Sequence, residues 1–218
     1  GASLKIEAPQ TSALLYDTAT NSRILVDNGS KMELYSSRLD GNDATVRFYG
    51  AASRGSRFDI DNNSTVIIEA EEGAAPAVRF RADGQFFVKG NSKLQMYNGG
   101  NGSPNNSANQ GIEFANDGGV FDLSGVGTEV NIVSDFGPAI GGNSSMEINV
   151  REGTSFTAIG RSSTASGAIF NGSISNITID NPLFFDFKNT RPNGGNIYSV
   201  SASSIFDLKN SNFAAWTN

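Results

Sequence analysis

The chain has 218 residues, of which 38% are hydrophobic, and a formal net charge of -6. The acidic balance argues against nucleic acid as a partner, because nucleic-acid binding needs a basic surface. Cysteine and histidine are both absent, which removes nearly every zinc or copper site and any histidine general base. No apolar run is long enough to span a bilayer, so we expect no membrane insertion.

Taken in chain order, pairs of short strand patterns begin at Arg23, Arg57, Gln85, Val120, Glu147, Asn176 and Ile205. In the second pair, Phe58 and Ile60 alternate with polar residues, an Asn-Asn-Ser turn follows, and Val66 and Ile68 alternate in the same way. Alternation of this kind gives both strands one apolar side. Repetition of one such unit along the chain indicates a solenoid.

A third, shorter apolar segment precedes each pair and divides the chain into seven coils: 12–43, 44–75, 76–110, 111–137, 138–166, 167–194 and 195–218. Three short strands per coil predict an all-β fold, a right-handed parallel β-helix (β-solenoid) that forms a single domain over residues 1–218. A β-sandwich also has many short strands. It has no reason, however, to repeat the same strand order in units of about thirty residues.

The alignment of the coils predicts three interior columns of side chains. The first contains Ile24, Phe58, Phe86, Phe121, Ile148, Ile177 and Phe206. The second contains Val26, Ile60, Val88, Leu123, Val150, Ile179 and Leu208. The third contains Met32, Val66, Leu94, Val130, Phe156 and Phe185. A polar insertion, residues 99–110, has no apolar anchor, so we expect it to project as a mobile loop.

Outward positions of the second strands place aspartates close together. Stacked coils put Asp27 beside Asp61, with Asp59 two residues along the strand. Carboxylates at this spacing suit a Ca²⁺ ion or the acid/base cleavage of a polysaccharide. The alternative is a ladder of ion pairs, Asp61 with Lys89 and the carboxylates with Arg57, that relieves like-charge contacts.

Arginines and aromatic residues form the second candidate site. Arg47 and Arg79 occupy matching outward positions in neighbouring first strands, and guanidinium groups at strand spacing match the carboxylates of an anionic sugar polymer. Aromatic side chains stack on sugar rings as on other apolar planes. The predicted ligand-binding residues are Arg47, Arg79, Arg57, Phe87, Arg81 and Tyr97. The alternative is solvated charge, with the aromatic side chains packed under loops.

One segment resembles a known family. PLFFDFKNTRPNGGNIYSV, residues 182–200, together with FDLSGVGTEVNIVSD from Phe121, resembles the pectate-lyase-like adhesive domains of Gram-positive bacterial surface proteins. The resemblance covers roughly the second half of the chain. It implies an extracellular β-solenoid, excised here from a larger wall-anchored protein. Such a domain attaches to host or environmental polysaccharides or glycoprotein glycans, pectin-like polymers included, or mediates cell–cell aggregation.

Enzymes of that fold use a Ca²⁺-binding carboxylate cluster with an arginine base, or several aspartates with a histidine. This chain has no histidine, and only Asp27, Asp59, Asp61 and Arg57 approach a lyase set. The resemblance, together with the incomplete catalytic set, therefore implies a non-catalytic adhesin domain, which we expect to need no cofactor, with Ca²⁺ as the one candidate ion. Two alternatives stay open: a polysaccharide lyase or glycoside hydrolase that uses the aspartates, and a self-associating structural module.

Overall fold

The computed structural model describes residues 1–16, 20–39, 43–50, 53–100, 109–116, 118–161, 167–191, 196–200, 205–210 and 215–217. In these residues every regular element is a β-strand, β1 to β20, and neighbouring strands pair in parallel. In the same residues no helix is long and apolar enough to cross a membrane. The all-β prediction is confirmed, and parallel pairing distinguishes the fold from an antiparallel β-sandwich.

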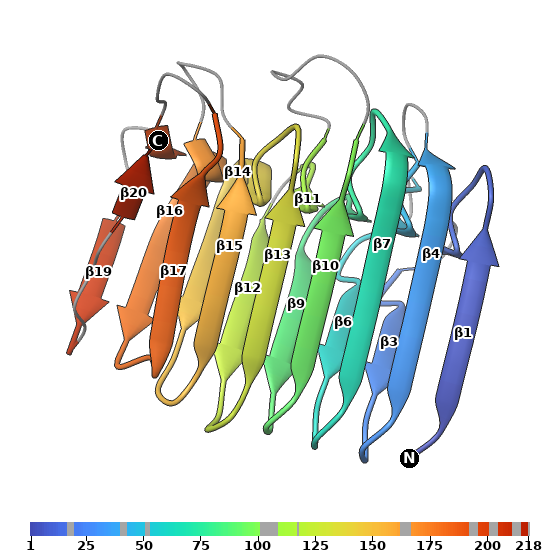
Figure 1. Ribbon diagram of the computed structural model, residues 1–218, viewed down its shortest axis with the longest axis horizontal. Helices are drawn as coiled ribbons and strands as arrows, with labels where there is room; N and C mark the ends of the chain where they lie inside the picture. The colour runs from blue at the N-terminus through green and yellow to red at the C-terminus, as the bar shows by residue number, and fades with distance from the viewer. Residues whose placement is uncertain are drawn as a thin grey trace.

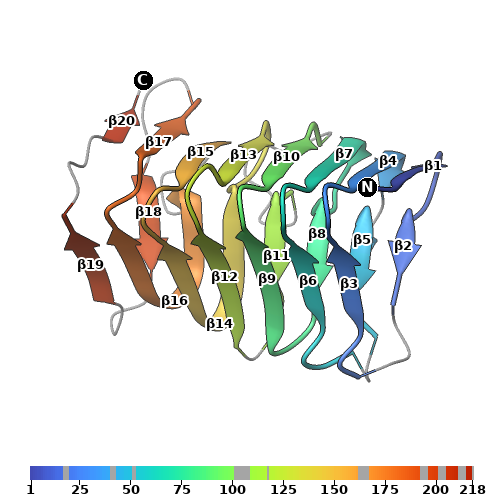
Figure 2. The ribbon, with the colours of Figure 1, turned by 90° about the horizontal axis from the view of Figure 1, so that it is seen from below.

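Each coil adds one strand to each of three faces, as Figures 1 and 2 show. Face 1 holds the first strands: β2 (Leu14–Leu15), β5 (Val46–Phe48), β8 (Val78–Phe80), β11 (Ile112–Phe114) and β18 (Asn196–Val200). Face 2 holds the second strands: β3 (Arg23–Val26), β6 (Arg57–Ile60), β9 (Gly84–Lys89), β12 (Gly119–Ser124) and β19 (Ile205–Lys209). Face 3 holds the third strands: β1 (Ser3–Ala8), β4 (Lys31–Leu39), β7 (Thr65–Gly73), β10 (Lys93–Asn98), β13 (Glu129–Ser134), β15 (Ser155–Gly160), β17 (Phe184–Asn189) and β20 (Ala215–Thr217).

Two long strands, β14 (Ile140–Val150) and β16 (Gly167–Asp180), belong to both face 1 and face 2. The beginning of β14 pairs with β11 on face 1, and Met146–Val150 pairs with β12 on face 2. The register between β14 and β16 shifts after Gly142, where the two strands turn the corner. The predicted parallel β-helix with three short strands per coil is therefore confirmed.

The three interior columns predicted from the sequence are confirmed by the strand registers. In the first column, Phe58 pairs with Ile24 on one side and with Phe86 on the other. The same registers continue along the second and third columns to Leu208 and Phe185. Equivalent residues of the repeat thus lie one strand spacing apart, roughly 4.8 Å.

Stacked aromatic rings fill much of the interior. Phe48 stacks on Phe80 with ring centroids 5.0 Å apart, and Phe80 stacks on Phe114 at 5.2 Å. One apolar core runs from Ile24 to Phe187. Each fully buried phenylalanine contributes roughly 1.5–3 kcal/mol, so the rings hold successive coils together.

A short turn joins β3 to β4, β6 to β7 and β9 to β10, so that each of these strands of face 2 leads directly into a strand of face 3. Asn62 and Asn63 have φ angles of 51° and 62°, in the left-handed region that asparagine tolerates better than most residues. The turns also stack: the Gly29 N–H donates to Asn62 O, and the Asn63 N–H donates to Gly90 O, both at 2.8 Å. The repeated Asn-rich turn of the sequence is thus part of the coil-to-coil contact.

The predicted insertion at residues 99–110 lies mostly outside the described residues, which include only Gly99, Gly100, Asn109 and Gln110 from it. Asn109 and Gln110 are buried just before β11. The projecting loop stays a prediction for the rest of the segment.

Candidate functional site

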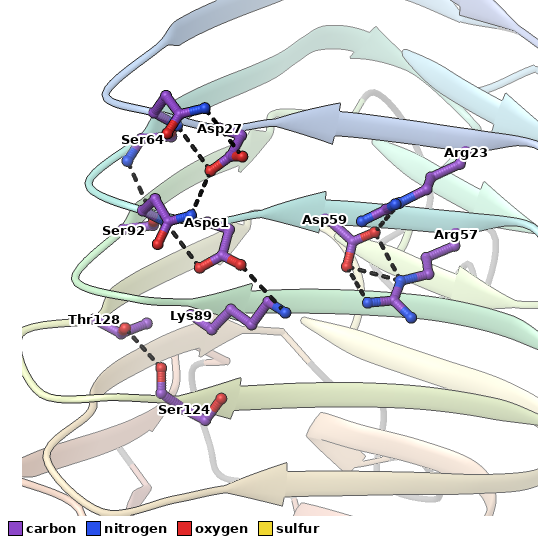
Figure 3. Close-up of polar contacts among 12 residues, drawn as sticks. Arg23, Asp27, Arg57, Asp59, Asp61, Ser64, Lys89, Ser92, Ser124 and Thr128 are labelled. Atoms are coloured by element: carbon purple, nitrogen blue, oxygen red, sulfur yellow. Dashed lines mark hydrogen bonds and ion pairs between the residues drawn. The ribbon is translucent and has the colours of Figure 1, made fainter. Parts of the chain in front are cut away.

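Face 2 carries the three aspartates of the predicted calcium or catalytic site, and the structure separates them. Asp59 lies in β6, where its side chain is fully buried between two arginines. Its Oδ2 accepts hydrogen bonds of 2.7 Å from Nε of both Arg23 and Arg57. Figure 3 shows this cluster set apart from Asp27 and Asp61, which lie at the turns.

Asp27 and Asp61, the two aspartates at the turns, each contact a side chain of a neighbouring coil. Asp61 Oδ2 lies 3.2 Å from Lys89 Nζ, and Asp27 Oδ1 accepts a hydrogen bond of 2.7 Å from Asn62 Nδ2. Among the described residues, no group of three or more His, Cys, Asp or Glu side chains is placed to hold a metal ion. The ion pairs of Asp61 with Lys89 and of Asp59 with Arg57, which the sequence offered as the alternative to a Ca²⁺ site, are observed, whereas Asp27 contacts the Asn62 amide instead.

The environment of Asp59 keeps its carboxyl group charged. Burial raises the pKa of Asp59, but the hydrogen bonds and charges of Arg57 and Arg23 together outweigh burial and hold the pKa below its usual value. A carboxyl group with a lowered pKa is a poor general acid at neutral pH. The Asp59 side chain therefore cross-links two coils and is not placed to act as a general acid.

Arg57 and Phe87, two of the predicted ligand-binding residues, contact each other. The Arg57 guanidinium lies over the Phe87 ring, 4.2 Å from the ring centroid, within the range of a cation–π interaction. Further along face 2, Arg151 Nε and Nη2 donate to Asp122 Oδ2 at 2.9 and 2.7 Å. Much of the charge on face 2 is thus neutralised within the protein.

Face 1 gathers arginines around one tyrosine. Arg47 and Arg79 are register neighbours, as predicted. The guanidinium carbons of Arg79, Arg81 and Arg47 lie 4.7, 5.7 and 5.9 Å from the centroid of the Tyr49 ring. Arg47 also pairs with Asp43 at 2.9 Å. The arginines are therefore close together, but their charges already face an aromatic ring and a carboxylate.

Arg79 is not the exposed guanidinium that the sequence predicted. It is 5% exposed and forms an ion pair with Glu113 on the adjacent strand. Burial raises the pKa of Glu113, and the Arg79 charge offsets this effect only in part. Strand alternation correctly placed Arg79 outside the apolar core, yet neighbouring groups cover it on the outer side.

Face 3 presents a different kind of outer surface. Each of β10, β13 and β15 points three side chains outward, and the middle positions are Gln95, Asn131 and Thr157, which the registers place side by side. Within the described parts of the chain, the side chains of these three residues take part in no hydrogen bond or ion pair. Their donors and acceptors are therefore available to a ligand.

Two adjoining hollows cross this part of face 3, and both include Gln95 and Asn131. The larger hollow, of about 400 Å³, extends to Thr157 and Ile159, and the smaller, of about 250 Å³, extends to Tyr97. We call the two hollows together the face 3 groove. The groove crosses the strands and therefore runs along the axis of the β-helix.

An apolar row borders the groove on one side. Tyr97, Val133 and Ile159 follow one another in register, and Tyr97 is 37% exposed. The Tyr97 hydroxyl donates a hydrogen bond of 2.8 Å to Asp135 Oδ2, which raises the pKa of Tyr97 and anchors the ring. The row supplies an apolar surface next to the polar middle positions.

Charged side chains lie at both borders of the groove, Lys93 and Glu129 opposite the apolar row and Glu69 beside Tyr97. Lys93 Nζ lies 2.9 Å from Glu129 Oε2, so these two charges neutralise each other. Glu69 lines the smaller hollow near Tyr97. Taken together, the groove and its borders have more carboxylates than cations.

Of the six predicted ligand-binding residues, only Tyr97 lines the face 3 groove. The sequence did contain a signal for the polar residues of the groove, because the interior column of Leu94 and Val130 implies that Gln95 and Asn131 point outward. The sequence does not show which outward polar side chains find a hydrogen-bonding or ion-pair partner in the folded protein. A row of unpaired groups can be recognised only when the paired ones are known.

The coil geometry and the groove define the class of the protein: a three-sided parallel β-helix with a shallow polar groove along one face. Comparisons with protein-family models, with curated proteins and with solved structures find no match to the chain. The class therefore rests on the strand registers and on the side chains described above.

Proposed function

We propose that this protein is a non-catalytic adhesin domain of the bacterial cell surface and that it binds polysaccharide along a face of the β-helix. The observation that carries the proposal is the face 3 groove, where Gln95, Asn131 and Thr157 line up beside the exposed Tyr97 ring and have no hydrogen-bonding partner among the described residues. Sugars present hydroxyl groups and apolar ring faces, which match such polar and aromatic surfaces. The resemblance of residues 182–200 to adhesive domains supports the same function and an extracellular location.

The repeating fold suits a repeating ligand. Neighbouring coils present equivalent positions at a spacing of roughly 4.8 Å, so an extended polymer meets an uncharged polar group in each of three successive coils, at Gln95, Asn131 and Thr157. Each contact is weak, and multivalent display on a cell surface raises the avidity. The ion pairs of Asp59 support a binding role in preference to a lyase or hydrolase, because this carboxylate is buried against two arginines.

A polysaccharide panel tests the proposed function. The purified protein is run in native gels that contain one soluble polysaccharide each, and the products of the same polymers are assayed for new reducing ends and unsaturated sugars. We expect retarded migration with at least one polymer and no cleavage products. Cleavage abolished by Asp61→Ala, or the failure of every polymer to bind, contradicts the proposal.

A second candidate function, self-association, has its own observation. The last described face 2 strand, β19, exposes Ile205 at 62% and both Phe206 and Leu208 at 38%. Another coil laid on β19 would cover these apolar side chains. Sedimentation at several concentrations tests this function: association that Leu208→Glu prevents supports it, and a monomer at all concentrations rejects it.

A further inference from the structure

We propose that the face 3 groove selects uncharged, extended glycan chains and binds them along the axis of the β-helix, with Gln95, Asn131 and Thr157 as the recognition ladder. The inference rests on the proposed function and names its site and ligand class. It differs from the anionic polymer that the arginines of the sequence suggested.

The hydrogen-bonding ladder is the first argument. Gln95 and Asn131 each carry an amide, which both donates and accepts, and Thr157 carries a hydroxyl, which does the same. The three positions span two strand spacings, roughly 10 Å along the axis. Sugar hydroxyls also donate and accept, so successive residues of an extended chain find a partner in each coil. Elsewhere on the molecule, outward groups such as Asp59 and Asp122 are already paired.

The apolar border is the second argument. Tyr97 is held in place by its hydrogen bond to Asp135, so its exposed ring is a fixed platform. Val133 and Ile159 continue the apolar row through the next two coils. A sugar ring has an apolar face of C–H groups, which packs on such a row while its hydroxyls reach the ladder.

The charge of the groove is the third argument and determines the ligand class. Lys93 is neutralised by Glu129 at 2.9 Å. Glu69 and Asp135 add carboxylates near Tyr97, and the whole chain has a net charge of -6. A polyanion therefore meets repulsion at this face, whereas an uncharged chain does not.

The experiment compares one polymer in its charged and its uncharged form and adds three uncharged polymers with other backbones. Binding is measured by affinity electrophoresis with polygalacturonate, with the same polymer fully methyl-esterified, and with galactomannan, xyloglucan and mixed-linkage β-glucan. We expect at least one uncharged polymer to bind, the esterified polymer to bind more tightly than polygalacturonate, and added salt to have little effect on the uncharged ligands.

Matched variants locate the site. Gln95→Ala combined with Asn131→Ala removes two hydrogen-bonding side chains that have no partner in the described structure, so folding should be unaffected. We expect binding to weaken about tenfold or more. Gln85→Ala is the control, because Gln85 lies in the same coil but points outward from β9 on face 2, and it should bind like the parent protein.

The Tyr97 platform is tested by two substitutions. Tyr97→Phe keeps the ring and loses the hydrogen bond to Asp135, so it should retain most of the binding, whereas Tyr97→Ala should lose about tenfold.

Each further outcome is decisive. Tighter binding of polygalacturonate than of its methyl ester, or parent-like binding by the double variant, overturns the inference while leaving a polysaccharide-binding adhesin in place. The absence of binding to all five polymers overturns the inference and the proposed function together.

Discussion

Phe58 and Phe86 lie face to face in neighbouring coils, with ring centroids 5.0 Å apart and ring planes 2° from parallel. Both rings are fully buried. The contact connects β6 and β9 through side chains as well as through backbone hydrogen bonds, and the next ring, Phe121, meets Phe86 edge-on at 5.8 Å. Ring contacts of this kind make the coils cooperative, because a gap in one coil removes contacts from both neighbours.

The first prediction concerns this aromatic column. Phe86→Ala should lower the free energy of unfolding by about 3–5 kcal/mol, because it leaves a cavity among rings that cannot collapse. The adjacent Phe87→Ala is the control: its ring points outward against Arg57, so the loss should be about 1 kcal/mol. Urea unfolding monitored by circular dichroism measures both. Equal losses for the two variants would mean that the rings are not packed as described.

The core was the part of the structure that the sequence could predict. A strand has a period of two residues, so the alternation around Phe58 and Ile60 specified which side chains point inward. Repetition of the pattern then specified that Phe86 and Val88 lie above them. Both inferences depend only on the backbone and on apolar side chains, which need no partner of a particular kind.

The site was harder to predict for a physical reason. Alternation shows that Arg79 and Gln95 both point away from the core, but one is covered and paired with Glu113 while the other lies in an open groove. The difference arises from side chains of neighbouring coils and from segments between the strands. Those contacts depend on three-dimensional positions that a one-dimensional pattern does not contain.

The second prediction separates a buried ion pair from an exposed one. Asp59→Asn should lower the free energy of unfolding by about 1–3 kcal/mol, because two charged hydrogen bonds to Arg23 and Arg57 are weakened. We expect a loss below the top of that range, because the Arg23 side chain is 51% exposed and water screens its charge. Asp61→Asn, at a partly exposed pair with Lys89, should cost less than about 1 kcal/mol. A larger effect at Asp61 than at Asp59 would contradict this ranking.

The third prediction is the dependence of stability on pH. The pKa of Asp59 is lower in the folded protein than in the unfolded chain, where an aspartate titrates near about 3.9. In the acidic range the unfolded chain binds this proton more readily than the folded protein does. The stabilisation is therefore fully present above the unfolded pKa and is lost as the pH falls through the lower, folded pKa.

Unfolding free energies of the parent and of Asp59→Asn, measured from pH 7 down to about pH 3, test this dependence. The difference between the two proteins should be constant near neutral pH and should shrink below about pH 4. A difference that grows on acidification has the wrong sign and would exclude the ion pair as its origin.

The fourth prediction concerns calcium. Asp59 is closed off by arginines, and Asp61 is paired with Lys89, so millimolar Ca²⁺ should leave the melting temperature unchanged. Thermal unfolding with and without CaCl₂, and with MgCl₂ as the control, measures the effect. A rise specific to Ca²⁺ that disappears in Asp61→Ala would restore the calcium site suggested by the sequence.

The fifth prediction concerns a glycine at the end of β7. Gly73 has a φ of 122°, and a Cβ added there would collide with the backbone oxygen of Leu39 in the coil before it. Gly73→Ala should therefore lower the free energy of unfolding by more than about 2 kcal/mol, since both the backbone conformation and the coil spacing oppose the methyl group. Gly29 is the matched control, because its φ is 68° but a Cβ there would meet nothing within 4 Å. Gly29→Ala should cost about 1 kcal/mol, the strain of the left-handed conformation alone. Equal costs for the two substitutions would show that neighbouring coils yield readily at this corner, in conflict with a tightly stacked β-helix.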